Sequence, residues 1–179
     1  MARAVIAEAL TATCPDVAAL KASLPFDASN RETERTALTH ALFCPTCKPI
    51  ADDMRRAQVA ETDRLAAEAA LEKADVCDKA AQVIETNGHC RRYLYDTKQA
   101  AGGTKLADCR VDIIGAINIA IGGTPRYAGT GLGAVVERAL LQRIPEACIT
   151  DWNDTKGRTK ADAITLLRDT AAALREVTA

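Results

Sequence analysis

The residues best suited to chemistry lie in one short stretch, residues 40–47 (His-Ala-Leu-Phe-Cys-Pro-Thr-Cys). If this stretch is helical up to its phenylalanine, His40 and Cys44 lie one turn apart on the same helix face. The proline ends that helix and suits the first turn of a new one, so Cys47 falls near a helix N-terminus, which favours a thiolate. These are three soft ligands, and tetrahedral zinc takes four. Cys14, the only earlier cysteine, is the candidate for the fourth.

A CxxC motif can also be a redox dithiol, and this alternative stays open together with a coincidental spacing. A thioredoxin-like dithiol follows a strand in a βαβ unit. Residues 36–43 instead have a helical pattern, and no parallel-sheet pattern surrounds them. We therefore favour zinc. Four protein ligands would make a closed structural site, because no position is left for a catalytic water.

The spacing resembles that of the zinc-binding anti-sigma factor family of bacteria. Cys14 precedes His40 by 26 residues, and H-x3-C-x2-C follows. The resemblance covers roughly residues 10–60 and implies a small helical domain in which Cys14, His40, Cys44 and Cys47 bind zinc. It also implies that the helices clamp an RNA-polymerase sigma factor. The chain departs from the family at Pro45, because the family's helix often runs through the CxxC motif.

The composition indicates an all-α protein. Aromatic residues make up only 3% of the 179 residues, and alanine is abundant, which favours helices packed closely through small side chains. The net charge of −1 argues against a general nucleic-acid binder. The N-terminus lacks a signal-peptide pattern and no window is apolar enough to span a membrane, so we expect a cytoplasmic protein whose seven cysteines are metal ligands or buried thiols.

The first half should consist of helices that bring the four ligands together. We expect helices at residues 2–12 and from Pro15 to about Leu24, and a third helix that Ser29 and Glu32 open as a capping box and that carries His40. Residues 50–87 contain neither proline nor glycine, which predicts one long helix, or two with a break near residues 74–75.

The predicted organisation is a zinc-binding helical module at residues 1–60, a helical linker at 61–74 and a helical domain at 75–179. In the last of these, Asn87-Gly88 should end a helix, and residues 89–96 alternate enough to predict a short strand or extended turn, with a short strand pair as one option. Further helices are expected at residues 109–121 and 132–144. Thr159 and Asp162 form a capping box for a terminal helix to Val177.

The second half resembles a family of unknown function from actinobacteria and their phages. The resemblance covers roughly residues 75–177 and rests on four short motifs: Asn87-Gly88-His89, Gly115-Ala116-Ile117, Trp152-Asn153-Asp154 and Gly157-Arg158-Thr159. It implies a fold and a lineage but no activity. An enzyme would need His89, Asp154 and Arg158 to converge. No nucleophile–base pair is visible at an interpretable spacing. We therefore favour a loop that Trp152 anchors and whose Asn153 and Asp154 side chains cap neighbouring backbone groups.

Together these patterns favour a zinc-binding protein-interaction module of the anti-sigma type, which regulates transcription by sequestering a protein partner such as a sigma factor. Oxidation of the ligand thiols could expel zinc and release the partner. The alternative is a zinc-stabilised structural or host-interaction protein of phage or actinobacterial origin without catalytic activity. Neither hypothesis predicts direct contact with nucleic acid or a membrane.

Overall fold

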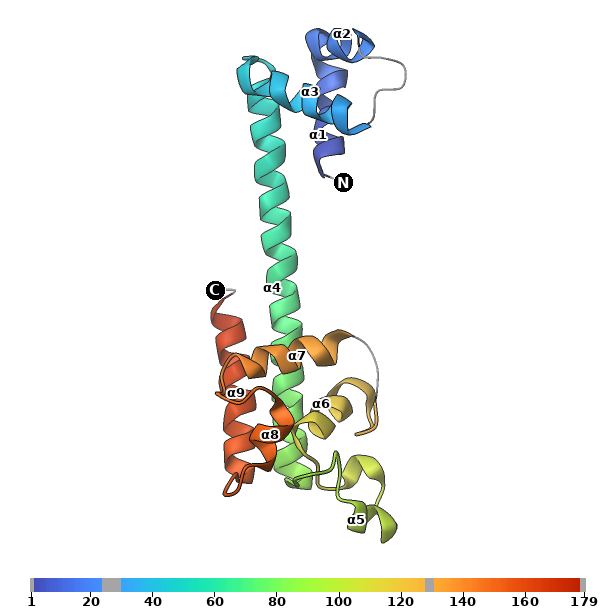
Figure 1. The fold of residues 1–179 in the computed structure, drawn as a ribbon, viewed down its shortest axis with the longest axis vertical. Helices are drawn as coiled ribbons and strands as arrows, with labels where there is room; N and C mark the ends of the chain where they lie inside the picture. The colour runs from blue at the N-terminus through green and yellow to red at the C-terminus, as the bar shows by residue number, and fades with distance from the viewer. Residues whose placement is uncertain (1, 24–29, 128–130, 178–179) are drawn as a thin grey trace. The chain divides into compact units, whose positions relative to one another are not determined.

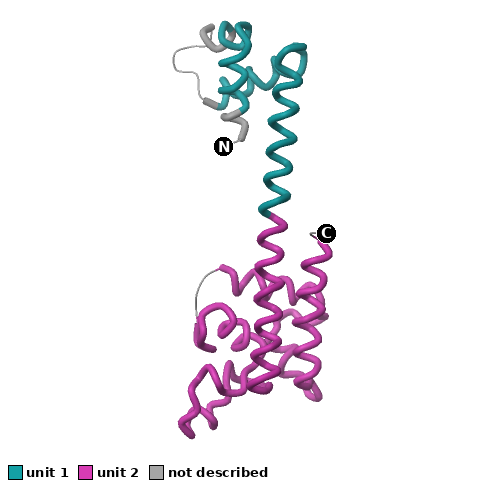
Figure 2. Tube along the Cα trace, turned by 180° about the vertical axis from the view of Figure 1, so that it is seen from behind, with its two compact units in different colours: residues 1–65 teal, residues 66–179 magenta. Residues whose placement is uncertain are grey.

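The computed structural model describes residues 2–23, 30–127 and 131–177 and is all-α, as the composition predicted (Figure 1). The described residues form nine α-helices and one 3-10 helix, and none of them belongs to a named strand. They divide into two compact units, residues 1–65 and 66–179 (Figure 2). Within the described part of the chain, no helix is long and apolar enough to cross a membrane.

The first unit packs α1 (Ala2–Thr13), α2 (Pro15–Ser23) and α3 (Asn30–Phe43) with the start of α4 (Cys47–Asn87). Its core is small, as the abundance of alanine predicted, and contains Ile6, Leu10, Val17, Ala37 and Ala41 together with two cysteines. Pro15 occupies the first position of α2, where its missing N–H costs nothing. The predicted capping box at Ser29 lies outside the described residues.

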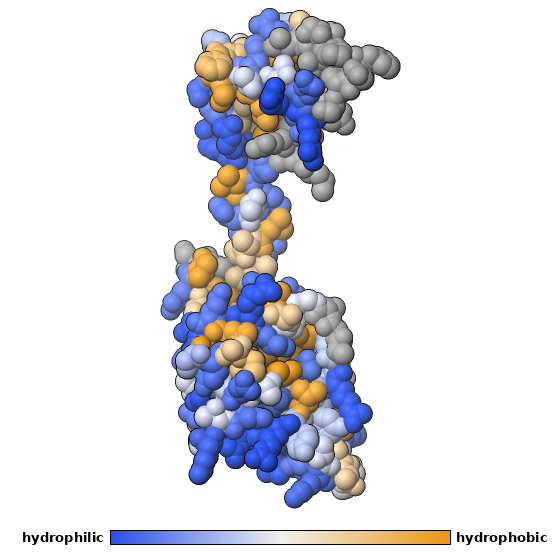
Figure 3. Space-filling model, in the orientation of Figure 1, coloured by the Kyte–Doolittle hydropathy of each residue, from blue (hydrophilic) through white to orange (hydrophobic). Residues whose placement is uncertain are grey.

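Helix α4 is a single helix of 41 residues without a break at residues 74–75. Most of its side chains from residue 52 to residue 69 are exposed, and hydrophilic and hydrophobic ones mix along it (Figure 3). Ion pairs three or four residues apart stabilise such a helix; they join Lys48 and Arg55 to Asp52, Arg56 to Asp53, and Arg64 to Glu61. The predicted linker, residues 61–74, lies inside this helix. The predicted domain bounds stay predictions.

The second unit packs the rest of α4 with α5 (Thr97–Ala101), η1 (Leu106–Asp108), α6 (Ile113–Gly122), α7 (Gly131–Leu141), α8 (Ile149–Asp154) and α9 (Lys160–Glu176). Its largest fully buried side chains include Ile84, Ile113, Ile117, Leu140 and Leu167. Arg175 near the end of α9 pairs with Asp75 and Asp78 of α4, at 3.0 and 2.7 Å.

Several helix ends in this unit follow local signals. Thr159 and Asp162 form the predicted capping box of α9, and Gly88 follows α4 with a φ of 95°. Helix α6 begins at Ile113, later than predicted, because the side chain of Asp112 caps it by accepting the N–H of Gly115.

Of the two alternatives predicted for residues 89–96, a short strand or an extended turn, the described chain has a turn and no strand. His89 and Tyr95 each form only an isolated β-bridge, and both bridges are to Val111. The backbone bends between the two bridges, where Arg92 has a φ of 72°. An extended ladder cannot continue through such a residue.

Candidate metal centre

Cys14 lies at the junction of α1 and α2. Its N–H donates to the carbonyl of Leu10 at 3.0 Å, and its own carbonyl accepts the N–H of Ala18 at 3.1 Å. It therefore ends one helix and caps the next. This position directs its thiol toward the free N–H groups at the start of α2, where a thiolate is stabilised.

His40 and Cys44 lie one turn apart, as the spacing predicted. The N–H of Cys44 donates to the carbonyl of His40 at 3.0 Å, and α3 ends at Phe43. The carbonyl of Cys44 then accepts the N–H of Lys48 at 3.0 Å across the Pro45-Thr46 turn. The chain thus passes into α4 with Cys47 as its first residue.

The four ligand atoms converge. The Sγ atoms of Cys14, Cys44 and Cys47 and a ring nitrogen of His40 all lie within 4.8 Å of one another. Cys14 Sγ lies 3.6 Å from His40 Nε2. Zinc bonds of about 2.3 Å to sulfur and about 2.1 Å to nitrogen would place these two atoms about 3.6 Å apart at tetrahedral angles. The spacing of this pair therefore matches a tetrahedral site, and the four groups lie close enough together to hold a metal ion.

Backbone N–H groups favour negative charge on two of the three sulfurs. The pKa of Cys14 is lowered, first of all by the N–H of Val17, and the pKa of Cys44 is lowered to about 6, chiefly by the N–H of Cys47. Burial and hydrogen bonds to both other thiols raise the pKa of Cys47 to about 12. Several sulfurs cannot all ionise at close range without a cation, and a metal ion would supply one.

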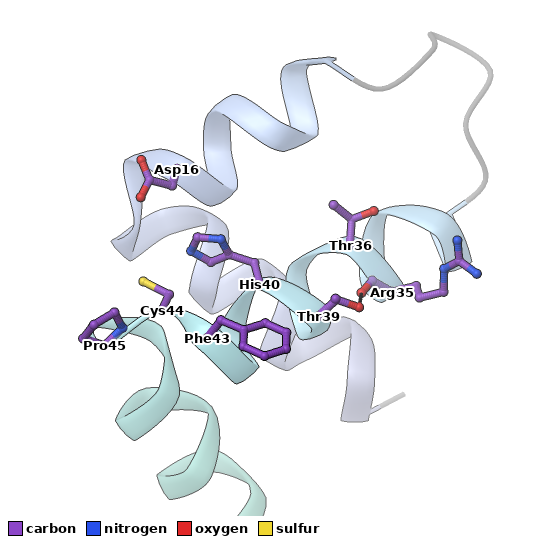
Figure 4. A pocket seen from close by; sticks show the side chains of 8 residues that line it. All are labelled: Asp16, Arg35, Thr36, Thr39, His40, Phe43, Cys44 and Pro45. Atoms are coloured by element: carbon purple, nitrogen blue, oxygen red, sulfur yellow. Dashed lines mark hydrogen bonds between the residues drawn. The ribbon is translucent and has the colours of Figure 1, made fainter.

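His40 interacts with the cysteines of the cluster. The hydrogen bond to Cys14 is the main cause that raises the pKa of His40. His40 and Cys44 extend to the same side of α3, toward the start of α2, whereas the ring of Phe43 points away from them (Figure 4). Cys14 and Cys47 are buried and the other two ligands are partly exposed, so a metal ion would lie near the surface.

An open pocket of about 810 Å³ adjoins the cluster. His40, Cys44 and Pro45 line it on the metal side, Phe43 lies between the two ligands in the chain, and Arg35 lines the pocket toward the N-terminal end of α3 (Figure 4). The Phe43 side chain is 82% exposed.

The second half contains no comparable reactive centre among the described residues. His89 and Asp154 are linked only through Asn153: His89 Nε2 lies 2.8 Å from its amide oxygen, and its amide nitrogen donates to Asp154 at 3.0 Å. The guanidinium of Arg158 instead stacks over Trp152 at 3.8 Å. The predicted Trp152 loop is itself a short helix, α8.

Sequence reasoning missed Asp112, which is buried together with Asn153. Desolvation, assisted by the charges of Asp154 and Glu137, raises the pKa of Asp112 to about 6. An aspartate directly before an apolar helical run is an N-cap signal, so its capping role was accessible from the sequence. Its burial was not, because residues distant in the chain cover it.

The fold and the cluster define an all-α protein with a Cys₃His group able to bind a metal ion. The chain belongs to a family of unknown function, DUF6197, which matches residues 68–173. This confirms the predicted membership of the second half in a family of unknown function; its actinobacterial and phage lineage stays an expectation. The match includes none of the four ligands, and the anti-sigma resemblance stays a prediction. No curated protein and no solved structure matches the chain.

Proposed function

We propose that the first unit is a zinc-binding protein-interaction module of the anti-sigma type, which regulates transcription by sequestering a sigma factor. The observation that carries the proposal is the convergence of Cys14, His40, Cys44 and Cys47 within 4.8 Å. Three thiols and an imidazole are a preferred donor set of structural zinc. The spacing of these ligands is the one that resembles the anti-sigma family.

Zinc in this cluster would join four helices at their ends. Cys14 lies between α1 and α2, His40 is in the last turn of α3, and Cys47 begins α4. The apolar core of this unit is small, and metal–ligand bonds would contribute much of its folding free energy. The four protein ligands leave no open position, so the role of the metal would be structural.

The C-terminal end of α3 offers the surface on which a partner could dock. Leu42 is 58% exposed and Phe43 is 82% exposed, and they are the two residues before a ligand, Cys44. Loss of the metal would free this end of the helix from α2 and α4. Binding of metal and binding of a partner would therefore be coupled through α3.

The same arrangement supports redox sensitivity. Cys44 and Cys47 are close enough for oxidation by one peroxide molecule, which would take two electrons from the two thiols, form one disulfide and yield two water molecules. A disulfide sulfur is a poor zinc ligand. We therefore expect peroxide to release zinc and the partner together.

Direct binding to purified sigma factors tests the proposal. The wild-type chain should bind one member of a panel of RNA-polymerase sigma factors in surface plasmon resonance. The double variant Cys44→Ser, Cys47→Ser should lose this binding together with zinc. Cys148→Ser is the matched control, because Cys148 lies outside the cluster and serine can replace it as the cap of α8.

A third variant separates the partner surface from the metal. Phe43→Ala should retain zinc and weaken sigma binding roughly tenfold or more, as expected for a buried aromatic contact. Sigma binding that survives the double cysteine variant would overturn the proposal. Zinc content without binding to any sigma factor would instead favour the zinc-stabilised structural or host-interaction protein.

A further inference from the structure

The second unit contains a turn with a strained backbone at Arg92. This residue has a φ of 72°, and among the described residues it is the only non-glycine with a positive φ. Bulky side chains disfavour this conformation, so neighbouring groups must hold it. The N–H of Arg92 donates to a carboxylate oxygen of Asp154 at 2.7 Å.

A buried amide holds the rest of the turn. Asn153 is 1% exposed, and its amide nitrogen donates to the carbonyl of Cys90 at 3.3 Å and to Asp154 at 3.0 Å. Its amide oxygen accepts from His89 Nε2 at 2.8 Å. The motif residues Asn153 and Asp154 therefore fix both sides of the turn, which explains their place in the sequence pattern without any catalytic role.

The turn presents two cations and an aromatic ring to solvent. Arg91 and Arg92 are exposed, and Tyr93 is 61% exposed. Among the described residues, the guanidinium of Arg91 has a 3.5 Å contact to the carbonyl of Thr155 and no ion pair. The hydrogen bonds of Asn153 and Asp154 hold the backbone of the turn, but they do not explain why Arg91, Arg92 and Tyr93 are exposed.

The segment that contains the turn is basic although the whole chain is not. Residues 89–110 contain five Lys or Arg residues and two Asp residues, whereas the chain has a net charge of −1. One of the two, Asp96, pairs with Arg110. Arg126, from outside this segment, stacks on Tyr95 at 5.1 Å. This segment of the chain therefore carries three more positive than negative charges, and the exposed Tyr93 directly follows two of its cations.

We propose that the Arg91-Arg92-Tyr93 turn binds single-stranded nucleic acid. The two guanidinium groups suit backbone phosphates, and the exposed ring of Tyr93 suits stacking with an unpaired base. An acidic peptide would use the cations but not the flat ring, so the aromatic side chain favours a nucleic acid. The expectation of no contact with nucleic acid rested on the net charge of the whole chain and does not describe this turn. The proposal is independent of the metal centre.

Fluorescence anisotropy of the full chain with labelled single-stranded DNA and RNA of about 20 nucleotides tests this proposal, since such lengths exceed typical single-strand sites. The double variant Arg91→Ala, Arg92→Gly removes both charges, and glycine tolerates the positive φ. We expect it to weaken binding roughly tenfold and to reduce the salt dependence by about two phosphate contacts. Tyr93→Leu should weaken binding about fivefold or more through lost stacking.

The matched control is the double variant Arg55→Ala, Arg56→Ala, which removes two exposed cations from α4. It should bind within about twofold of wild type, because it leaves the turn intact. Absence of binding at micromolar protein would overturn the proposal, as would an equal loss in the control. Equal affinity for duplex DNA or for polyglutamate would also overturn it, because neither offers an unpaired base. Circular dichroism should show that all variants are folded.

Discussion

At the scale of the residue, Asp112 is the carboxylate whose ionisation is most constrained by the fold. It is 4% exposed, and burial is the main cause that raises its pKa to about 6. The folded state therefore holds this proton more tightly than the unfolded chain does. The stabilising effect is fully present below the unfolded pKa, near 4, and is lost as the pH rises through about 6.

The variant Asp112→Asn should remove this pH dependence. Asparagine keeps an oxygen that can accept the N–H of Gly115 but cannot ionise. From pH 4 to pH 7 the stability of the variant relative to wild type should rise by up to about 3 kcal/mol, which corresponds to about two pKa units. Urea unfolding of both proteins at several pH values measures the difference. The same pH dependence in both proteins would contradict the assignment.

The residues of the metal cluster could be predicted because their signal is local. His40, Cys44 and Cys47 lie within one turn of a helix and the start of the next, where spacing alone determines proximity. Asn153 could not be placed in the same way. Its partners His89 and Cys90 lie more than 60 residues away in the sequence, and only the folded unit brings them together.

At the scale of the element, the N-terminus of α6 approaches the backbone of the preceding turn closely. A Cβ atom built at Gly115 would lie 2.0 Å from the carbonyl oxygen of Leu94. A backbone oxygen cannot rotate away as a side chain can. Gly115 is therefore required by a contact between two segments rather than by its own φ, and the short motif that contains it reflects packing.

The variant Gly115→Ala should lower the free energy of unfolding by about 2–3 kcal/mol, because the added methyl group overpacks this contact. Gly133→Ala is the matched control in α7. A Cβ atom there would meet only Ile121 Cδ1, at 3.8 Å, so alanine should stabilise the helix by up to about 1 kcal/mol. Thermal and urea unfolding measure both changes. Equal effects of the two variants would show that the Leu94 contact is not tight.

Helix positions were predictable and some helix ends were not. Pro15, Gly88 and the Thr159–Asp162 capping box act within a few residues of themselves, and the structure follows them. The start of α6 was placed too early, because its apolar pattern extends past the capping Asp112. For residues 89–96 the sequence left a short strand and an extended turn as alternatives, and the strand is absent because hydrogen bonds from α8 bend that segment.

At the scale of the whole molecule, each unit has its own apolar core, and only the first contains the cluster. Removal of a bound metal should therefore destabilise the first unit selectively. We expect a zinc chelator to lower the midpoint of one of two thermal transitions and to leave the other unchanged. Differential scanning calorimetry of the full chain, with and without chelator, checks this. A single thermal transition whose midpoint falls with chelator would contradict the expectation that the two units unfold independently.

The sequence predicted the all-α class because its alanine content, long proline-free stretch and caps all act locally. The described chain divides after Leu65, inside a continuous helix and within the linker predicted at residues 61–74 from its polar, alanine-rich composition. The function is harder to predict from the sequence than the fold. The family match covers the second unit and carries no activity, whereas the metal cluster lies outside the match.

Metal content tests the central claim most directly. Elemental analysis of protein purified without added metal or chelator should find about one zinc per chain, as expected for one closed four-ligand site. Cys14→Ser should lose most of the zinc and part of the helicity of the first unit, whereas Cys148→Ser should keep both. One zinc per chain that is lost in Cys14→Ser and kept in Cys148→Ser would support the metal centre at Cys14, His40, Cys44 and Cys47. Protein that contains no zinc, or that keeps it in Cys14→Ser, would contradict it.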